Sequence, residues 1–216
     1  MLFLNKPVLI LGAGGHASVI VDILREQQRK ILGIVSPEID IGKKIFQGIS
    51  HFHNDDDVLS FSPDTILLVN GIGSLPKSLL RAQIYEKFIL LGYEFETVVA
   101  SNALVSKYVN LAKGSQILSG AIVQTGVIIG ENTIINSGAI IEHDCCIGRN
   151  NHIAPGVTLS GQVTTQSHVH IGTGATVIQS VNIGRGSIVG AGSTVLKNVA
   201  ENMISYSAKG YQKAFT

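Results

Sequence analysis

The chain has 216 residues, a length that allows one large domain or two small ones. Its formal net charge of +1 gives no reason to expect a nucleic acid or an acidic membrane as a partner. Charged residues make up only 14% of the sequence, hydrophobic residues 45%, and glycines number 24. This balance indicates that further copies of the chain cover much of its surface.

Two features predict a cytoplasmic protein. The two cysteines, Cys145 and Cys146, are adjacent and form no disulfide framework, which is typical of a reducing compartment. The apolar run VLIL near the N-terminus is too short for the core of a signal peptide or for a membrane span. We therefore expect neither export nor membrane insertion.

The first hundred residues alternate between strand-like and helix-like segments. The predicted order is a strand at KPVLILG, a turn and helix at AGGHASVIVDILREQQRK, a strand at ILGIVS, a strand at TILLVNGIG, a helix at PKSLLRAQIYEKFILLGY and a strand at EFETVVA. Strand–helix alternation predicts a small, half-Rossmann-like parallel α/β domain over residues 1–100, with the boundary near residues 98–104.

A glycine loop follows the first predicted strand and opens the first predicted helix. Gly12, Gly14 and Ala17 fit the GxGxxG/A pattern, in which backbone N–H groups at a helix N-terminus approach a phosphate. A dinucleotide site would also need an acidic residue about 20 residues further on. Glu38, behind Ser36, fits that requirement poorly, and the domain is short for a dinucleotide fold. The loop therefore favours a nucleotide sugar, and a tight turn without a ligand stays open.

A second glycine loop, NGIGS, ends the third predicted strand and contains Gly73. The carboxyl ends of parallel strands share one edge of a sheet, so both loops should meet on one rim. Gly14, Gly15 and His16 of the first loop and Gly73 of the second are therefore candidate substrate contacts. His16 could touch the ligand or could only cap the turn, and the residues alone leave both open.

From about Ser101 the chain repeats every six residues. Aliphatic side chains occupy fifteen of the sixteen positions at this period from Val105 to Val195, and only Thr165 differs. This is the hexapeptide β-helix pattern, in which each hexad forms a short strand and a corner and the aliphatic side chain points inward. Cys145 falls on a small-residue position and is expected to be structural. The pattern predicts a β-helix over residues 101–216, with a C-terminal cap over its open end.

Three segments, GAGGHA, VNGIGS and EHDCCIGRNNHIAPG, resemble in this order the bacterial sugar O- and N-acyltransferases. That family includes sialic acid O-acetyltransferases and N-acetyltransferases of UDP-4-amino sugars. The resemblance covers nearly the whole chain. It implies a left-handed β-helix with three hexads per coil, a homotrimer that binds acetyl-CoA between neighbouring β-helices, and an N-terminal half that holds a nucleotide-sugar substrate.

The resemblance also implies site residues. His143 matches the catalytic histidine and Asp144 the adjacent acid that supports it, with Glu142 as the second choice for that role. His152 matches the histidine that meets the coenzyme near its thioester. The remaining expected contacts are Gly161, Thr173 and Gly190 for the coenzyme, and Ser36 beside the glycine loops for the substrate. Two segments depart from the family: Ser36-Pro37 stands where UDP-sugar relatives tend to carry an Asp pair, and SAKG replaces a more basic tail.

The residue types suit acyl transfer from a thioester. Imidazole, with an unperturbed pKa near ~6.5, serves as a general base at neutral pH, and a carboxylate on its other nitrogen fixes the tautomer. His143 and Asp144 fall at a coil corner, where adjacent side chains need not point in opposite directions. A backbone N–H near Gly161, one coil above His143, is the candidate for oxyanion stabilisation. We expect acetyl-CoA-dependent N-acetylation of a nucleotide-linked amino sugar in surface glycan biosynthesis, and O-acetylation of sialic acid or a related sugar stays open.

The same residues allow other interpretations. His143 could be an idle surface histidine, and the whole chain could be a non-catalytic trimeric scaffold that binds nucleotide sugars. Some β-helices are zinc enzymes, but the spacings of 9, 16 and 2 between His143, His152, His168 and His170 do not match theirs, so no metal is expected. His152 and His170 should stack on adjacent coils. The segment HFHNDDD is interpreted as a solvated loop rather than a cation site.

Overall fold

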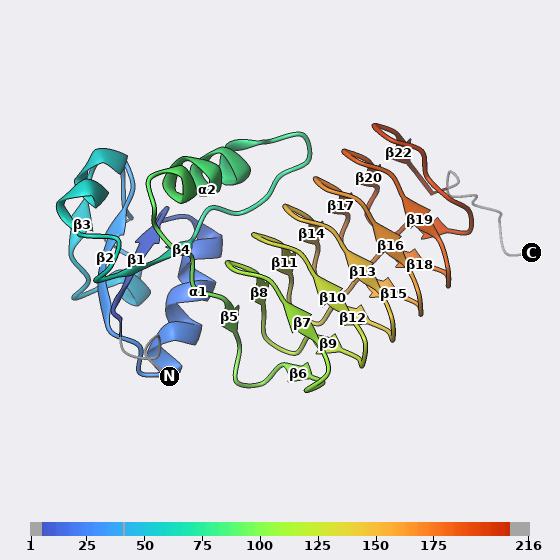
Figure 1. Cartoon of the computed structure of the whole chain (residues 1–216), viewed down its shortest axis with the longest axis horizontal. Coiled ribbons are helices and arrows are strands. Elements are labelled where there is room, and N and C mark those ends of the chain that lie inside the picture. Colours follow the sequence, from blue (N-terminus) through green and yellow to red (C-terminus); the bar gives the residue numbers. More distant parts are fainter. Residues whose placement is uncertain (1–5, 41, 208–216) are drawn as a thin grey trace, which may run out of the picture.

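The structure is a computed structural model that describes residues 6–40 and 42–207. It consists of a small α/β domain followed by a long β-helix (Figure 1). The α/β domain has a parallel sheet of order β3-β2-β1-β4, formed by β1 (Val8–Leu11), β2 (Ile31–Val35), β3 (His51–Phe52) and β4 (Leu67–Asn70). Its helices are α1 (Gly15–Glu26) and α2 (Leu80–Leu90), with short 3-10 helices at Lys44–Phe46 and Asp55–Ser60.

The α/β domain differs in three places from the predicted order of elements. The two-residue strand β3 was not predicted, because a strand this short has no detectable alternation. The expected second helix begins only at Leu80, since Lys77 has a φ of +66° and interrupts the helical backbone. The expected last strand is divided: Phe95 bridges to Leu68 in the sheet, whereas β5 (Val98–Val99) pairs with the β-helix.

The β-helix has three parallel sheets with seven, six and five two-residue strands. The seven-stranded face contains β5, β8 (Gln116–Ile117), β11 (Ile134–Ile135), β14 (His152–Ile153), β17 (His170–Ile171), β20 (Ile188–Val189) and β22 (Ile204–Ser205). The six-stranded face contains β6 (Leu104–Val105), β9 (Ile122–Val123), β12 (Ile140–Ile141), β15 (Thr158–Leu159), β18 (Thr176–Val177) and β21 (Thr194–Val195). The five-stranded face contains β7 (Asn110–Leu111), β10 (Ile128–Ile129), β13 (Cys146–Ile147), β16 (Thr164–Thr165) and β19 (Asn182–Ile183).

The six-residue repeat corresponds to this architecture. Each strand from β6 to β21 ends on one of the sixteen repeat positions, and those side chains fill the interior of the prism. The prediction of a left-handed β-helix with three hexads per coil is therefore confirmed. Cys145 is 1% exposed and belongs to the same core, and burial raises the pKa of its thiol to about 11, as expected for a structural cysteine. The division at residue 100 stays a prediction, and the first paired strand of the β-helix lies just before it.

Thr165 stands at the one non-aliphatic repeat position because it satisfies a buried amide. Its Oγ1 accepts a hydrogen bond from Asn151 Nδ2 at 2.6 Å, and Asn151 is only 1% exposed. In turn, Asn151 Oδ1 accepts from the Val169 N–H. A threonine at this position therefore lets one asparagine link two adjacent coils inside the prism.

We expect Thr165→Val to lower the free energy of unfolding by about 1–3 kcal/mol, because the valine keeps the volume but leaves the Asn151 amide without an acceptor. Urea unfolding at one fixed protein concentration measures the change. Thr194→Val, at an exposed position of β21, is the matched control. Unchanged stability of Thr165→Val would show that the buried hydrogen bond contributes nothing.

The α/β domain packs on the seven-stranded face and on one neighbouring corner. Leu118 and Ile134 of the β-helix share a core with the α/β domain. Polar contacts add to it: buried Arg81 at the start of α2 donates to the Asn132 carbonyl at 3.2 Å, and Gln116 Nε2 donates to the Asn70 carbonyl at 2.9 Å. The two parts are therefore joined by a packed, hydrogen-bonded interface.

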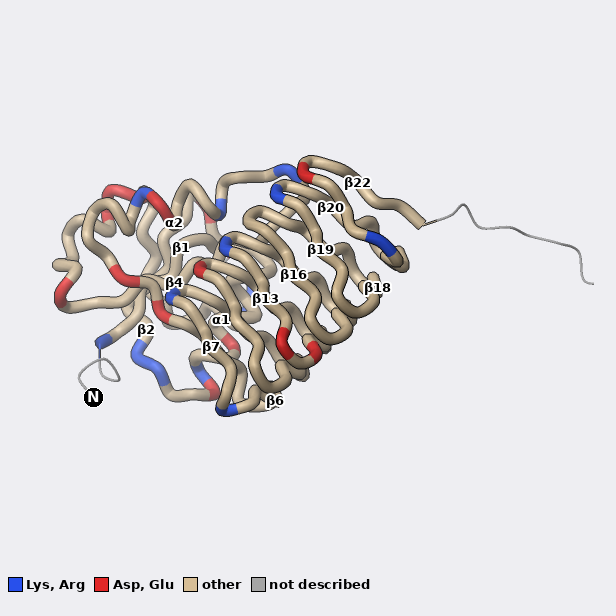
Figure 2. Tube along the Cα trace, turned by 45° about the vertical axis from the view of Figure 1, so that its right-hand side comes forward, with Lys and Arg blue, Asp and Glu red and all other residues tan. Residues whose placement is uncertain are grey.

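In Figure 2, most of the visible trace of the β-helix is coloured as neither acidic nor basic. Among the described residues, neither helix has the length and hydrophobicity needed to cross a membrane.

Candidate active site

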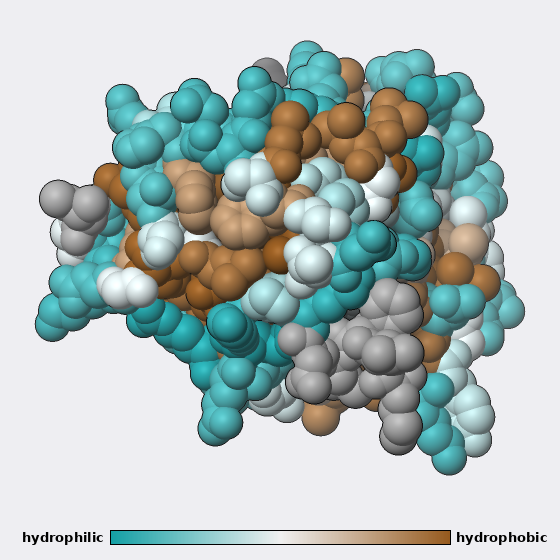
Figure 3. Space-filling view, turned by 60° about the vertical axis from the view of Figure 1, so that its left-hand side comes forward, coloured by the Kyte–Doolittle hydropathy of each residue, from teal (hydrophilic) through white to brown (hydrophobic). Residues whose placement is uncertain are grey.

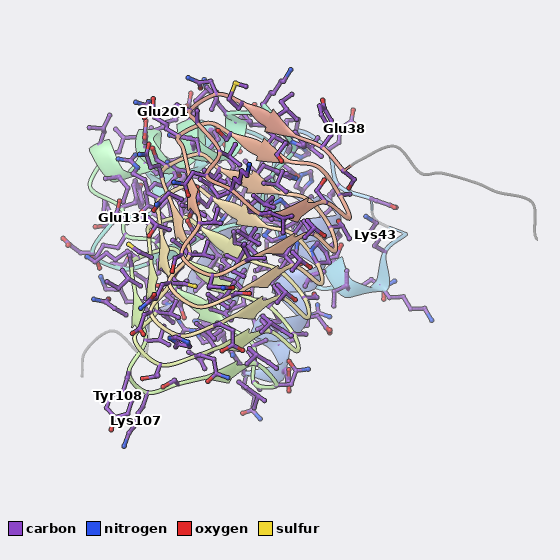
Figure 4. The ribbon with its side chains drawn as sticks, turned by 90° about the vertical axis from the view of Figure 1, so that its right-hand side faces the viewer. Glu38, Lys43, Lys107, Tyr108, Glu131 and Glu201 are labelled. Carbon is purple, nitrogen blue, oxygen red and sulfur yellow. The ribbon has the colours of Figure 1, made fainter. Side chains whose placement is uncertain are left out.

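His143 and Asp144 form the corner between β12, on the six-stranded face, and β13, on the five-stranded face. Asp144 has a φ of +59°, which turns the chain sharply. As a result the two adjacent side chains meet, with His143 Nδ1 2.9 Å from Asp144 Oδ2. Figure 4 marks the same corner in the first coil by the labels of Lys107 and Tyr108, which join β6 to β7. Glu142 is half-buried beside the pair.

The Asp144 carboxylate determines which ring nitrogen of His143 is free. A carboxylate can only accept a hydrogen bond, so Nδ1 is the nitrogen that carries the proton. Nε2 then has a lone pair, which is the arrangement of a general base. More than half of each side chain is exposed (55% and 58%), so a substrate can reach this nitrogen.

Glycines above and below allow this pair to lie close to the backbone. One coil above, an ideal Cβ at Gly161 would be 2.6 Å from His143 Nε2. One coil below, a Cβ at Gly126 would overlap the Asp144 carboxylate. The Gly161 N–H donates to no backbone carbonyl of the described residues, whereas its carbonyl accepts from Ser180. The Gly161 backbone therefore lies close to Nε2, and the role of its N–H in oxyanion stabilisation stays a prediction.

A separate cavity of about 470 Å³ lies between the two glycine loops and the seven-stranded face. The residues that line it are Gly15, His16, Val19, Ile72, Gly73, Ser74, Leu75, Ser78, Leu80, Leu118, Asn136 and His152. The two loops thus share one rim, as predicted, and none of these side chains is an acid, a lysine or an arginine. Leu75 and Leu80 at the rim are exposed, and Figure 3 shows hydrophobic patches on the side where the α/β domain comes forward.

The glycines of these loops have different tasks. Gly12 has a φ of +101° and packs against Gly71 and Ile72, so it serves the turn and the contact between the loops. Gly14 caps α1 without a side-chain hydrogen bond, and nothing lies within 4 Å of an added Cβ at Gly14 or Gly15. The open backbone at Gly14 and Gly15 is the part of the motif that leaves room for a ligand.

His16 lies at the start of α1 and points to the β-helix. Its Nε2 is 2.7 Å from Gln116 Oε1. Burial, followed by the positive charge of Arg81, lowers the pKa of His16 to about 4, and the hydrogen bond to Gln116 opposes this only in part. His16 is therefore neutral at physiological pH.

His152 lies on the floor of the cavity and is also held neutral. Burial lowers its pKa to about 3, with smaller contributions from the charges of His170, His16 and Arg81. Asn136 Nδ2 lies 3.0 Å from His152 Nε2, while Asn136 Oδ1 accepts from the Ser137 N–H. The amide must therefore donate to Nε2, which occupies that lone pair. His152 is suited to binding and orientation rather than to proton abstraction.

His170 stacks on His152 as predicted, with ring centroids 4.8 Å apart in an edge-to-face arrangement. The two histidines are neighbours on the seven-stranded face because β14 and β17 pair in register at these positions. Burial lowers the pKa of His170 as well.

The other predicted site residues lie at different places in the fold and do not form one site within the chain. Ser36, 7% exposed, lies after β2 outside the cavity, and its Oγ donates to the Glu38 carbonyl at 2.7 Å. Thr173 is exposed at the corner after β17, and Gly190 follows β20 near the next corner on that side. Gly161 lies instead beside His143. The four expected coenzyme contacts therefore do not meet in one chain. Most of the SAKG tail and the rest of the expected cap lie outside the described residues, which end at Ser207.

Within residues 6–40 and 42–207, no three His, Cys, Asp or Glu side chains come together in a way that could hold a metal ion. His51 instead contacts the Ser36 carbonyl at 2.8 Å and stacks on His53.

Sequence reasoning missed Gln116, Asn136 and Arg81. Gln116 contacts His16 and Asn136 contacts His152, as described above, and Arg81 Nη1 donates to the Asn70 and Ile72 carbonyls of the second glycine loop. In the sequence, Gln116 and Asn136 are polar residues next to a repeat aliphatic, as in Gln116-Ile117 and Ile135-Asn136. Such positions point outward and are polar at many surface sites, so the sequence could not assign them a role.

The comparisons agree with this architecture. Residues 7–88 match the PglD N-terminal domain, and residues 126–161 match the bacterial transferase hexapeptide (six repeats) family. The structure of PerB from Caulobacter crescentus in complex with CoA and GDP-perosamine has a TM-score of 0.83 and 29% identity, covering 93% of each chain. This chain is a hexapeptide-repeat acyltransferase with a PglD-type N-terminal domain.

Two further solved structures resemble this acyltransferase. The acetyltransferase domain of PglB from Neisseria gonorrhoeae FA1090, in complex with acetyl coenzyme A, has a TM-score of 0.84 and 25% identity, covering 94% of this chain and 96% of that one. WeeI from Acinetobacter baumannii AYE, at 22% identity, shares the fold with a TM-score of 0.79 and coverage of 92% and 95%. No curated protein sequence gave a match.

Proposed function

We propose that this acyltransferase transfers the acetyl group of acetyl-CoA to the amine of a nucleotide-linked amino sugar, with His143 as the general base. The observation that carries the proposal is the His143–Asp144 pair, 2.9 Å apart, with a free Nε2 beside the Gly161 backbone. The similarity to PerB and to the PglB acetyltransferase domain supports the choice of CoA and of a nucleotide sugar. We further propose a cytoplasmic role in glycan biosynthesis, consistent with two free cysteines.

The proposed step is a direct transfer. The sugar amine attacks the acetyl carbonyl carbon, and as the C–N bond forms the amine proton moves to His143 Nε2. The C–S bond then breaks, and the leaving thiolate takes up the proton held by the His143 imidazolium, which returns His143 to its neutral form. Asp144 stabilises the imidazolium that His143 becomes, and the Gly161 N–H is the donor offered to the oxyanion. No covalent enzyme intermediate is needed, and the buried thiol of Cys145 takes no part.

We also propose a homotrimer in which each site combines two chains. In one chain, the His143 corner joins the six- and five-stranded faces, whereas the cavity with His16 and His152 opens on the seven-stranded face. A substrate held in that cavity is therefore on a different side of the prism from the base of the same chain. Exposed Leu104 on β6 and Ile128 on β10 support burial of those two faces against further copies.

The function is tested by thiol release from acetyl-CoA with a panel of acceptors: GDP-perosamine, a UDP-linked 4-amino sugar, the matching nucleotide sugars with a hydroxyl in place of the amine, and free and CMP-linked sialic acid. The proposal expects release with an amino sugar and none with its hydroxyl counterpart. Release only with hydroxyl acceptors would assign O-acetylation instead. Failure to bind acetyl-CoA would contradict the proposal as a whole.

The shared site is tested by mixing two impaired variants at a nucleotide-sugar concentration well below the wild-type KM. His143→Ala lacks the base and His16→Gln weakens substrate binding in the cavity, so a mixed trimer contains sites in which both residues are intact. We expect co-refolded or co-expressed mixtures to be more active than the sum of the two variants measured alone. If each site lies within a single chain, the activity of every mixture equals that sum.

A further inference from the structure

We propose that His16 recognises a hydrogen-bond donor of the nucleotide sugar, a hydroxyl, amine or ring N–H, through its Nδ1 atom, and that Gln116 of the β-helix is the positioning residue that imposes this polarity. The inference rests on the proposed function, because it names the chemistry by which the same substrate is held. It also means that His16 contacts a part of the ligand other than the phosphate groups, which are the ligand groups that the glycine-loop motif suggests.

The first step is the orientation of the Gln116 amide. Its Nε2 lies 2.9 Å from the backbone carbonyl of Asn70, which can only accept a hydrogen bond. The reverse orientation would place two oxygens face to face at that distance. Gln116 is fully buried, and Arg81 Nη1 donates to the same carbonyl at 2.9 Å, so water does not relieve such a clash. The amide oxygen of Gln116 therefore faces His16.

The second step is the tautomer of His16. The Gln116 oxygen lies 2.7 Å from His16 Nε2, so this nitrogen must carry a proton. The ring is neutral at physiological pH, since burial and Arg81 hold its pKa near 4. A neutral imidazole has one proton, which leaves Nδ1 with a lone pair and no hydrogen.

The third step is the surroundings of Nδ1. His16 lines the cavity between the glycine loops, and Nδ1 forms no hydrogen bond with any described residue. An unprotonated nitrogen repels phosphate oxygens and attracts a donor. The phosphates of a nucleotide sugar therefore fit the open backbone N–H groups at Gly14 and Gly15, where α1 begins, and His16 fits a hydroxyl, amine or ring N–H of the same molecule.

Through Gln116, a residue of the β-helix determines which ligand groups His16 can bind. It stands on β8, whereas His16 stands on α1, one hundred residues earlier. The side-chain amide thus connects the substrate loop of one domain to the scaffold of the other. Loss of the amide would free the imidazole to adopt either tautomer and would weaken the recognition of a donor.

The tautomer is measured directly in the unliganded protein. Long-range ¹⁵N–¹H NMR of ¹⁵N-histidine-labelled protein distinguishes a protonated from an unprotonated ring nitrogen, and comparison with His16→Gln assigns the signals. We expect Nε2–H and bare Nδ1 in the wild type, and a mixture in Gln116→Met, which keeps the side-chain volume. An Nδ1–H tautomer in the wild type would overturn the inference, whatever the reaction proves to be.

The ligand contact is tested by matched substitutions. Asn places a polar atom where histidine has Nδ1, and Gln places one where it has Nε2. We expect KM for the nucleotide sugar to rise about tenfold in His16→Gln and clearly less in His16→Asn, with KM for acetyl-CoA unchanged in both. The reverse order would contradict recognition through Nδ1.

Addition of ligands to the labelled protein identifies the donor. A shift of the His16 Nδ1 signal with the nucleoside diphosphate alone assigns the donor to the ribose or base. A shift that requires the complete nucleotide sugar assigns it to the sugar. Fluorescence or calorimetry shows independently whether each ligand binds. If the Nδ1 signal shifts with neither the nucleoside diphosphate nor the nucleotide sugar although both bind, the inference about His16 is wrong. The proposed acetyl transfer is not affected by that result.

Discussion

Replacement of His143 by alanine is expected to lower kcat by about 10²–10⁴-fold, the range contributed by a general base, while the affinity for acetyl-CoA stays near that of the wild type. The reason is that Nε2 is the free, exposed nitrogen of a ring whose other nitrogen is bonded to Asp144. Steady-state thiol release gives kcat, and calorimetry gives the affinity for acetyl-CoA.

Two further variants separate this chemistry from a general loss of structure. His53→Ala removes a histidine from an exposed loop of the α/β domain and should leave kcat unchanged. Asp144→Ala should lower kcat less than His143→Ala does, because the base is kept and only its orientation and the support of its charge are lost. An active His143→Ala enzyme would show that the proton leaves the substrate by another route.

A single methyl group at Gly161 is expected to lower kcat by on the order of 10²-fold, the effect of displacing a catalytic group by about 1 Å. In Gly161→Ala the new Cβ would be 2.6 Å from His143 Nε2 and 2.7 Å from Cε1, so the imidazole must move. Because His143 is exposed, the ring can move without loss of the core. Steady-state kinetics and thermal unfolding, measured together, should show low activity in a folded protein.

The control for this variant is Gly120→Asn, at a corner of another coil. Gly120 has a φ of +69°, which asparagine adopts at several corners of this β-helix, including Asn132 and Asn150, and nothing lies closer than 3.9 Å to its Cβ. We expect full activity there. A Gly161→Ala enzyme that is as active as the wild type would mean that His143 does not work from the position beside Gly161.

The β-helix could be predicted from sequence in nearly every strand. The repeat aliphatic of each hexad must fit the interior of the prism, and this constraint recurs every six residues, so Val105 to Val195 identify the strands one by one. The same regularity places His143 and Asp144 at a corner, which made their contact predictable. Even the exception, Thr165, follows the rule of a filled interior, although its partner Asn151 is recognisable only in three dimensions.

The cavity was harder to predict because it is formed between two domains. The glycine loops identified one of its walls, and Gly15, His16 and Gly73 do lie there. The other wall consists of residues of the β-helix such as Asn136 and His152, and the repeat places no constraint on outward positions. The roles of His16 and His152 depend on amide groups distant in sequence, which hydrophobic periodicity does not reveal.

The most direct measurement is the identity of the product. The protein would be incubated with acetyl-CoA and GDP-perosamine or a UDP-linked 4-amino sugar, and the product would be analysed by mass spectrometry before and after mild alkali, with His143→Ala in parallel. We expect a gain of one acetyl group that survives alkali, as an amide does, and that is absent with the variant. An acetyl group removed by alkali, or equal product with His143→Ala, would contradict N-acetylation with His143 as the base.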